Sequence, residues 1–348
     1  MVRVRTGCMA CVQREGLRAS AVLWRLGAGM RSLITCWIFR LSGILAWCAV
    51  SSSAQAIPEI PRLRLLDTAD GLPTNTVSAM AQDKDGYLWL ATTNGLARYD
   101  GSSVKVWQNQ PDNPNSIPGN VVRSIYIDTH NRLWVLARHA VVSVLNAQRT
   151  SVKRFLTTWH SDLHQPNVMV GQGDAVWVGD HDGVLTHLQH DGRQQRVALA
   201  TAGTAYRHSP ILALAFESNR LWIGTADGLL VWEQGHLRAA LPPALQTPIY
   251  SLTVVGWRVI AGTERGLWWR PVGLPLSQPW FKPQWGSMFA VGNLLRVAVE
   301  SGDGALWLGT TLGLWRTRGK QPPASMPEES FQDDRFHAIS ALWRDMDG

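Results

Sequence analysis

Few residues in this sequence have the types and spacing that catalysis or metal binding requires. Cys8 and Cys11 have the C-x-x-C spacing of redox and zinc sites, but no second Cys or His pair lies nearby to complete a tetrahedral zinc site. The segment Asp83-Lys84-Asp85-Gly86 has the start of a calcium loop, yet no Glu stands at the twelfth position. A hairpin turn is the better interpretation of that segment, because Asp-Gly is a common hairpin connection.

The histidines give no stronger sign of chemistry. His181, His187 and His190 are close in the sequence but fall on different predicted strands and loops, which disfavours a shared metal. The sequence contains no His-Glu-x-x-His pattern, phosphate loop, Gly-x-Ser-x-Gly elbow or dinucleotide fingerprint. We therefore predict no catalytic residue, no metal site and no cofactor, and we do not expect this chain to be an enzyme.

The charge of the chain is divided unevenly between a leader and a body. The 348 residues carry a net charge of +7, but residues 1–56 hold seven Arg and one acid, Glu15, a net of +6. Residues 57–348 hold the other 26 basic and 25 acidic residues, a net of +1. A nucleic-acid binder needs a basic face on the folded domain, so a nucleic-acid partner is not expected.

The leader has the three parts of a secretory signal peptide. From Met30 the chain has a basic start, the apolar stretch 41–50 and an Ala-x-Ala end at Ala54–Ala56. We predict that residues 1–56 are a leader cleaved after Ala56, with Met30 an alternative start. An uncleaved anchor is the other interpretation, although the apolar run is short for a span of about 20 residues. All four Cys lie in this leader, and the body is expected to be exported.

One unit is repeated through the body, from residue 57 to residue 348. Leu88-Trp89-Leu90-Ala91-Thr92-Thr93-Asn94-Gly95-Leu96 recurs closely at 221–229 and 306–314, and more weakly at 133, 176 and 259. The anchor positions, Trp in five copies and Ile260 in one, are 45, 43, 45, 38 and 47 residues apart. Each copy has a short apolar run, a polar turn, the Leu-Trp run, an Asn-Gly or Asp-Gly turn, and two further runs, which is the pattern of a four-stranded antiparallel propeller blade.

The fold class predicted is all-β, a β-propeller with six complete blades and an incomplete seventh. Residues 336–348 match the start of another unit, so the chain is expected to be a fragment that stops inside a blade. The apolar segment 63–66 precedes the first unit and is suited to close the ring as an outer strand. The repeated tryptophans are expected to fill the gaps between blades as structural anchors: Trp89, Trp134, Trp177, Trp222 and Trp307.

Ligand-binding residues are expected in the loops that enter each first strand and in those that follow each Leu-Trp strand. Propeller ligands sit over the central channel, where loops from several blades converge. The candidates differ from blade to blade, as a specific site requires: Asn75, Asn120, Arg138, His139, Asp180, His181, Arg207, His208, Glu264 and Arg265. Three tryptophans outside the anchor position, Trp159, Trp280 and Trp285, could stack on a flat ligand, although packing of outer strands is the favoured role.

The repeat resembles a known family. The stretch 70–77, the turn Asp83-x-Asp85-Gly86 and the stretch 88–100 resemble the two-component regulator propeller repeat, as do 120–122 with Leu133-Trp134. The resemblance covers residues 62–348 and weakens where Asp180 replaces Thr and Ile260 replaces Trp. It implies the amino-terminal sensor piece of a membrane-anchored bacterial receptor, whose output module, a histidine kinase or diguanylate cyclase, lies outside this chain.

The resemblance leads to a first functional hypothesis. The chain would be a periplasmic propeller that binds a small molecule or an oligosaccharide and passes the event to a cytoplasmic output. The alternatives are an exported propeller enzyme, such as a lyase or a quinoprotein-type dehydrogenase, and a non-catalytic interaction scaffold. The ligand, the output reaction and the oligomeric state, a homodimer included, are left open by the sequence.

Overall fold

The computed structural model describes residues 65–138, 141–156, 166–239, 245–282, 294–302, 304–317, 329–331, 339–342 and 344. The chain divides into two compact units, residues 1–65 and 66–348, and the described elements all belong to the second. The predicted leader of residues 1–56 lies outside the described residues, as do His139, Trp159 and Trp285. Among the residues described, no helix combines the length and the apolar character needed to cross a membrane.

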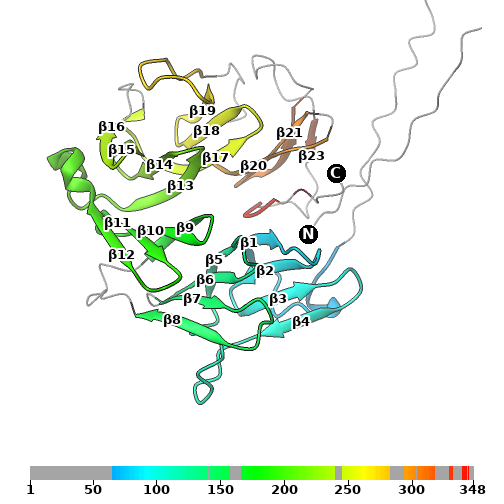
Figure 1. Cartoon of the computed structure of the whole chain (residues 1–348). Coiled ribbons are helices and arrows are strands. Elements are labelled where there is room, and N and C mark those ends of the chain that lie inside the picture. Colours follow the sequence, from blue (N-terminus) through cyan, green and yellow to red (C-terminus); the bar gives the residue numbers. More distant parts are fainter. Residues whose placement is uncertain are drawn as a thin grey trace, which may run out of the picture. The chain divides into compact units, whose positions relative to one another are not determined.

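Antiparallel sheets of four strands build the second unit (Figure 1). The first three blades are β1 (Val77–Gln82), β2 (Leu88–Thr92), β3 (Gly95–Tyr99) and β4 (Val104–Trp107); β5 (Val122–Ile127), β6 (Leu133–Ala137), β7 (Val141–Leu145) and β8 (Val152–Leu156); and β9 (Pro166–Gln172), β10 (Ala175–Asp180), β11 (Val184–Gln189) and β12 (Gln194–Ala198).

Three further sheets continue the series. They are β13 (Ile211–Glu217), β14 (Arg220–Thr225), β15 (Gly228–Glu233) and β16 (His236–Ala239); β17 (Ile249–Val255), β18 (Arg258–Thr263) and β19 (Gly266–Pro271); and β20 (Leu295–Glu300), β21 (Leu306–Thr310), β22 (Gly313–Arg316) and β23 (Glu329–Phe331). The fifth sheet has three strands, and an isolated bridge between Trp269 and Phe281 takes the place of a fourth. Short 3-10 helices, η1 (Thr68–Asp70), η3 (Leu199–Ala202) and η4 (Thr204–Tyr206), occupy loops.

The sheets are arranged around a ring with their first strands innermost. In Figure 1 the strands β1, β5, β9, β13, β17 and β20 face the centre, and each packs beside the next one in the series. This arrangement confirms the predicted all-β propeller. The seventh blade and the closure of the ring by residues 63–66 stay predictions, because the described residues include no strand at either place.

Hydrophobic cores lie between consecutive blades. Trp89 of the first blade packs with Val122, Leu133 and Leu145 of the second, and Trp134, Trp177 and Trp222 occupy the next three interfaces in the same way. Ile260 takes this position between the fifth and sixth blades, which explains why an aliphatic residue can replace Trp there. Trp307 is half-buried in the described part of the sixth blade.

Buried carboxylates hold several anchor tryptophans. The indole Nε1 of Trp89 donates to Asp83 at 2.8 Å, and Trp222 Nε1 donates to Glu217 at 2.7 Å. The other oxygen of Asp83 accepts the backbone N–H groups of Asp85 and Tyr87. The segment that began like a calcium loop is therefore an Asp-capped hairpin turn whose carboxylate also fixes the anchor indole.

A glycine two residues after four of the six anchors lets the next blade approach closely. A Cβ added at Gly179 would lie 2.4 Å from Ile211 Cγ2, and one at Gly309 would lie 2.5 Å from Ile339 Cγ2. Ile339 N also donates to the carbonyl of Thr310 at 2.9 Å, and Arg344 Nη1 donates to the carbonyl of Glu300 at 3.3 Å. Residues 339–342 and Arg344 thus lie along the sixth blade in the place where a following first strand would start.

Candidate functional site

The blades have two unlike ends. At one end lie the turns that join first to second and third to fourth strands, which we call the turn end. At the other lie the turns between second and third strands together with the connections between blades, which we call the loop end. Every ligand-binding residue predicted from the sequence falls at the loop end, and all except His139 are described.

Three of these candidates accept hydrogen bonds from backbone N–H groups of nearby loop residues. Asn75 Oδ1 accepts the N–H of Thr68 at 3.0 Å, and Asn120 Oδ1 accepts the N–H of Asn109 at 2.7 Å. Asp180 is buried, and its Oδ1 accepts the N–H groups of Asp182 at 3.0 Å and Val184 at 2.7 Å. These side chains hold loops in place.

Asp180 performs the turn role that Thr performs in other blades. Thr92 Oγ1 donates to the carbonyl of Gly95 at 2.7 Å and accepts the N–H of Asn94 at 3.1 Å. Thr225, Thr263 and Thr310 repeat both bonds. The departure of Asp180 from the repeat thus preserves a capped turn.

Two candidates pair with neighbours that the sequence analysis did not select. His208 Nδ1 lies 2.6 Å from Asp182 Oδ1, which joins the connection before the fourth blade to a turn of the third. Thr247 Oγ1 donates to Glu264 at 3.4 Å. Residues 26 and 17 positions apart form these pairs, and no spacing rule would have indicated them.

Four candidates are exposed at the loop end. Within the described part of the chain, their side chains form no hydrogen bond and no ion pair, which leaves their polar groups available to a ligand: Arg138, His181, Arg207 and Arg265.

A β-bulge recurs at the start of every innermost strand. In the first blade Val77 pairs with Thr92 and Ala79 with Ala91, so Ser78 is the extra residue. The same shift occurs in the five other blades. We call the six extra residues the inner bulges: Ser78, Arg123, Asn167, Leu212, Tyr250 and Arg296.

The inner bulges differ in type although their flanking positions repeat. Apolar residues precede five of them, and small or apolar residues follow all six, because those positions pack between blades. The bulge position itself carries a hydroxyl, two guanidinium groups, an amide, an aliphatic group and a phenol. Bulges re-aim side chains and are frequent beside functional sites. A fixed scaffold therefore places five different side-chain types at one equivalent position, where the innermost strands start at the loop end.

Arg123 is the best-positioned member of this set. Its Nη1 donates to Asn167 Oδ1 at 3.0 Å, and Asn167 Nδ2 donates to the carbonyl of Ile211 at 2.8 Å, so a chain of hydrogen bonds crosses three blades. Burial, and next the charge of Arg138, lower the pKa of Arg123. Arg138 is close because its N–H donates to the carbonyl of Val121 at 2.8 Å.

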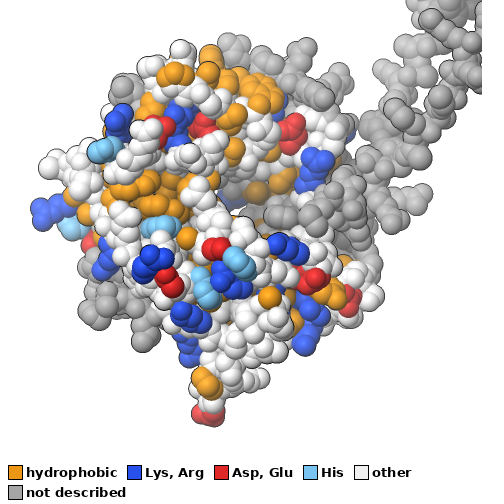
Figure 2. Space-filling view, viewed as in Figure 1, with side chains coloured by type: hydrophobic (Ala, Val, Ile, Leu, Met, Phe, Trp, Pro, Cys, Tyr) orange, Lys and Arg blue, Asp and Glu red, His pale blue; other side chains and the backbone are white. Residues whose placement is uncertain are grey.

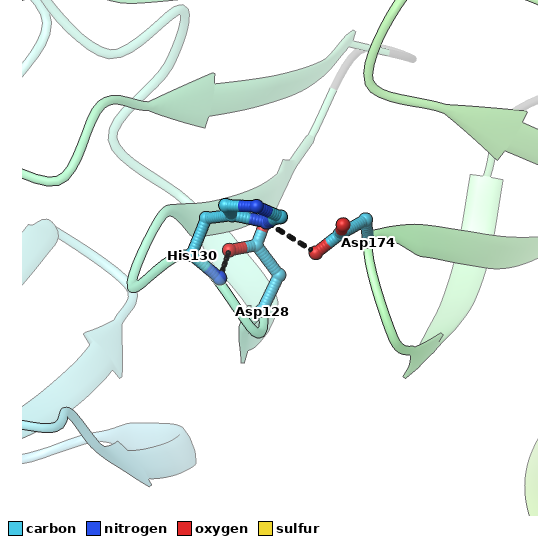
Figure 3. A group of neighbouring side chains, drawn as sticks. All are labelled: Asp128, His130 and Asp174. Atoms are coloured by element: carbon cyan, nitrogen blue, oxygen red, sulfur yellow. Dashed lines mark hydrogen bonds and ion pairs between the residues drawn. The ribbon is translucent and has the colours of Figure 1, made fainter.

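A second cluster lies at the turn end and has metal-ligating residue types. Asp128, His130 and Asp174 bring one ligand atom each within 4.8 Å of the others (Figure 3). His130 Nδ1 lies 2.8 Å from Asp174 Oδ1, and Arg132 Nε donates to Asp128 Oδ2 at 2.6 Å. Hydrogen bonds from Thr129 and His130 lower the pKa of Asp174.

This cluster has the bonding of a structural network. Asp128 Oδ2 also accepts the indole N–H of Trp134, while its Oδ1 accepts the backbone N–H groups of His130 and Arg132 at 2.9 Å each. Arg132 Nη2 lies 3.4 Å from Asp174 as well, so one arginine contacts both carboxylates. We assign the cluster to the joining of the second and third blades.

The other side chains considered for chemistry are dispersed or packed. His181 is at the loop end, His187 is in β11 and His190 follows β11 at the turn end, so the structure does not gather the three. Trp280 is buried against Trp222, with ring centroids 5.4 Å apart. On the face that Figure 2 displays, the described Lys and Arg side chains are interspersed with Asp and Glu.

Comparison with known proteins agrees with this geometry. Residues 71–94, which begin directly after η1 and include β1 and β2, match the family model described as two component regulator propeller. The histidine kinase P4 of Formosa agariphila is 42% identical over 48 residues, which are 14% of this chain and 4% of that protein.

Two solved structures show the same propeller fold. The extracellular domain of a putative hybrid two component system from B. thetaiotaomicron superposes with a TM-score of 0.61 at 17% identity, over 81% of this chain and 39% of that one. The extracellular domain of a putative one component system from the same organism gives 0.50 at 20% identity, over 82% and 38%. The chain described here spans well under half the length of these two proteins.

Proposed function

We propose that this chain is the ligand-sensing propeller of an exported bacterial signalling receptor. The receptor's output module, a kinase or a cyclase, would lie outside these residues, and the propeller itself would be non-catalytic and periplasmic. The family match at residues 71–94 and the propeller fold shared with extracellular domains of two-component systems support this proposal.

The observation that carries the proposal is the set of inner bulges. The anchors, turns and glycines recur because they serve the scaffold, whereas the bulge position carries five different residue types in six blades. Repeat proteins place binding specificity on such variable positions of a common framework. The ligand would sit over the middle of the loop end and contact several blades together.

The proposal is tested by ligand screening on the intact protein. Thermal unfolding would be followed with a panel of organic acids, sugars and oligosaccharides, since a ligand at a hundred times its Kd stabilises the folded state by about 2.7 kcal/mol. We expect at least one compound to raise the unfolding temperature and to change the receptor's output, with no turnover of that compound. Turnover by the propeller, or stabilisation by none of the panel, would contradict the proposal.

A further inference from the structure

We propose that the inner bulges bind an oxyanion, a carboxylate, sulfate or phosphate group of the sensed ligand, with Arg123 as its main contact and Arg138 beside it. The inference rests on the proposed function and deepens it, because it names the chemical class that the loop end recognises. It follows from how Arg123 is held, from its lack of a counter-charge and from its neighbours in the ring.

The guanidinium of Arg123 is oriented before any ligand arrives. One of its five N–H donors is used by Asn167 Oδ1 at 3.0 Å, and Asn167 is in turn fixed by the carbonyl of Ile211 at 2.8 Å. The described residues supply no hydrogen-bond acceptor for the remaining donors. An arginine fork fixed on one side and open on the other is suited to a bidentate oxyanion.

The arginines at the two ends of the blades differ in their partners. At the turn end Arg132 pairs with Asp128, Arg149 with Asp83, and Arg220 with Glu217 and Glu233. At the loop end Arg123 and Arg138 form no ion pair with any described residue.

Arg123 and Arg138 therefore form an uncompensated cationic pair. Burial and the charge of Arg138 both lower the pKa of Arg123, so the folded state tolerates this pair at some cost. An anion between the two guanidinium groups would offset that cost, whereas a neutral group would not.

The rest of the ring fits a ligand that has both an anionic group and an uncharged body. None of the six inner bulges is acidic, so no carboxylate among them would repel the anion. Leu212 and Tyr250, which follow Asn167 around the ring, offer an aliphatic and an aromatic surface. Arg296, at the sixth blade, is the second arginine among the inner bulges.

The first test measures sulfate binding to the intact protein by calorimetry, with ionic strength held constant by NaCl. We expect Arg123→Gln to weaken sulfate binding by roughly tenfold or more, since it removes a charge-assisted contact, and Arg138→Gln to weaken it less. Arg238→Gln is the matched control, because it removes the same charge from the exposed outermost strand β16. Equal sulfate affinity in the wild type and Arg123→Gln would overturn the proposal.

A second variant distinguishes a loss of sulfate binding from a folding defect. Arg123→Lys keeps the charge but loses the fork, so it should bind sulfate with an intermediate affinity while unfolding at the wild-type temperature. If Arg123→Gln unfolds at a lower temperature than the wild type, the sulfate affinity of Arg123→Lys is the deciding measurement. Wild-type affinity in the folded Lys variant would show that the guanidinium geometry is not used.

An organic pair separates the sources of the oxyanion and separates this inference from the sensor proposal. Trigalacturonate and its fully methylated ester share one sugar backbone, but the ester has methyl groups in place of the carboxylate charges. Preference for the acid, lost in Arg123→Gln, supports an organic acid, and binding of sulfate alone supports a free oxyanion. A neutral ligand that stabilises the wild type and Arg123→Gln equally would overturn the oxyanion site and leave the sensor proposal standing.

Discussion

Asp128 accepts the indole N–H of Trp134 at 3.0 Å across a turn of six residues, and both side chains are buried. The same carboxylate receives Arg132 Nε at 2.6 Å and caps its own turn. Asp83 with Trp89 and Glu217 with Trp222 repeat the relationship in other blades. A single acid therefore fixes a hairpin turn, an anchor ring and an arginine together.

Replacing Asp128 by Asn should destabilise the second blade strongly. The amide removes a buried negative charge and leaves the Trp134 N–H or Arg132 without an acceptor, which costs about 3 kcal/mol in the free energy of unfolding. Urea unfolding followed by tryptophan fluorescence measures the loss. Asp174→Asn is the control, because that carboxylate is 44% exposed and solvent screens its ion pairs, so the loss should be much smaller. Equal losses would refute the assignment of Asp128 as the organising residue.

Trp222 is a buried anchor that contacts an acid, an aromatic ring and an arginine. It bonds Glu217, meets Trp280 edge-on at 5.4 Å and lies 5.2 Å from the guanidinium carbon of buried Arg270. Trp222→Ala should cost about 3–5 kcal/mol, whereas Trp257→Ala, at a 37% exposed position, should cost much less. Similar unfolding midpoints for the two variants would contradict the anchor role.

Some of these features follow from the sequence and others do not. Trp89, Trp134, Trp177 and Trp222 could be placed between blades because one residue type recurs at one strand position. The second function of Asp83, as acceptor for Trp89, needs the three-dimensional path of the turn. The link from Arg123 to Asn167 joins residues 44 positions apart on different sheets, and only the bulge register brings them together. The loop end was predicted, but the inner bulges were not, because a bulge leaves no mark in a single sequence.

A substitution at Gly309 tests whether the segment that begins at Ile339 packs on the sixth blade. A Cβ there would meet Ile339 Cγ2 at 2.5 Å and Val297 Cγ1 at 2.8 Å, so Gly309→Ala should lower the free energy of unfolding by about 1–3 kcal/mol. Gly302→Ala, whose Cβ would meet only Arg344 Nη2 at 3.7 Å, is the control. A double-mutant cycle with Ile339→Ala should recover part of the loss. Strict additivity of the two substitutions would show that the segment does not lie against Gly309.

His187 should make stability depend on pH. Its ring stacks on Trp177 with centroids 4.5 Å apart, and burial lowers its pKa below the usual value of about 6.5. Between the folded and unfolded pKa values, the unfolded chain binds more protons, so the free energy of unfolding rises with pH and levels off above about 6.5. As the pH falls through 6.5 this stability is lost.

His187→Phe keeps an aromatic ring against Trp177 but removes the titration. Urea midpoints measured from pH 5 to pH 7.5 should therefore rise less steeply in this variant, with a smaller slope remaining from His190, whose pKa burial also lowers. Parallel curves for the wild type and His187→Phe would show that His187 does not titrate differently on folding.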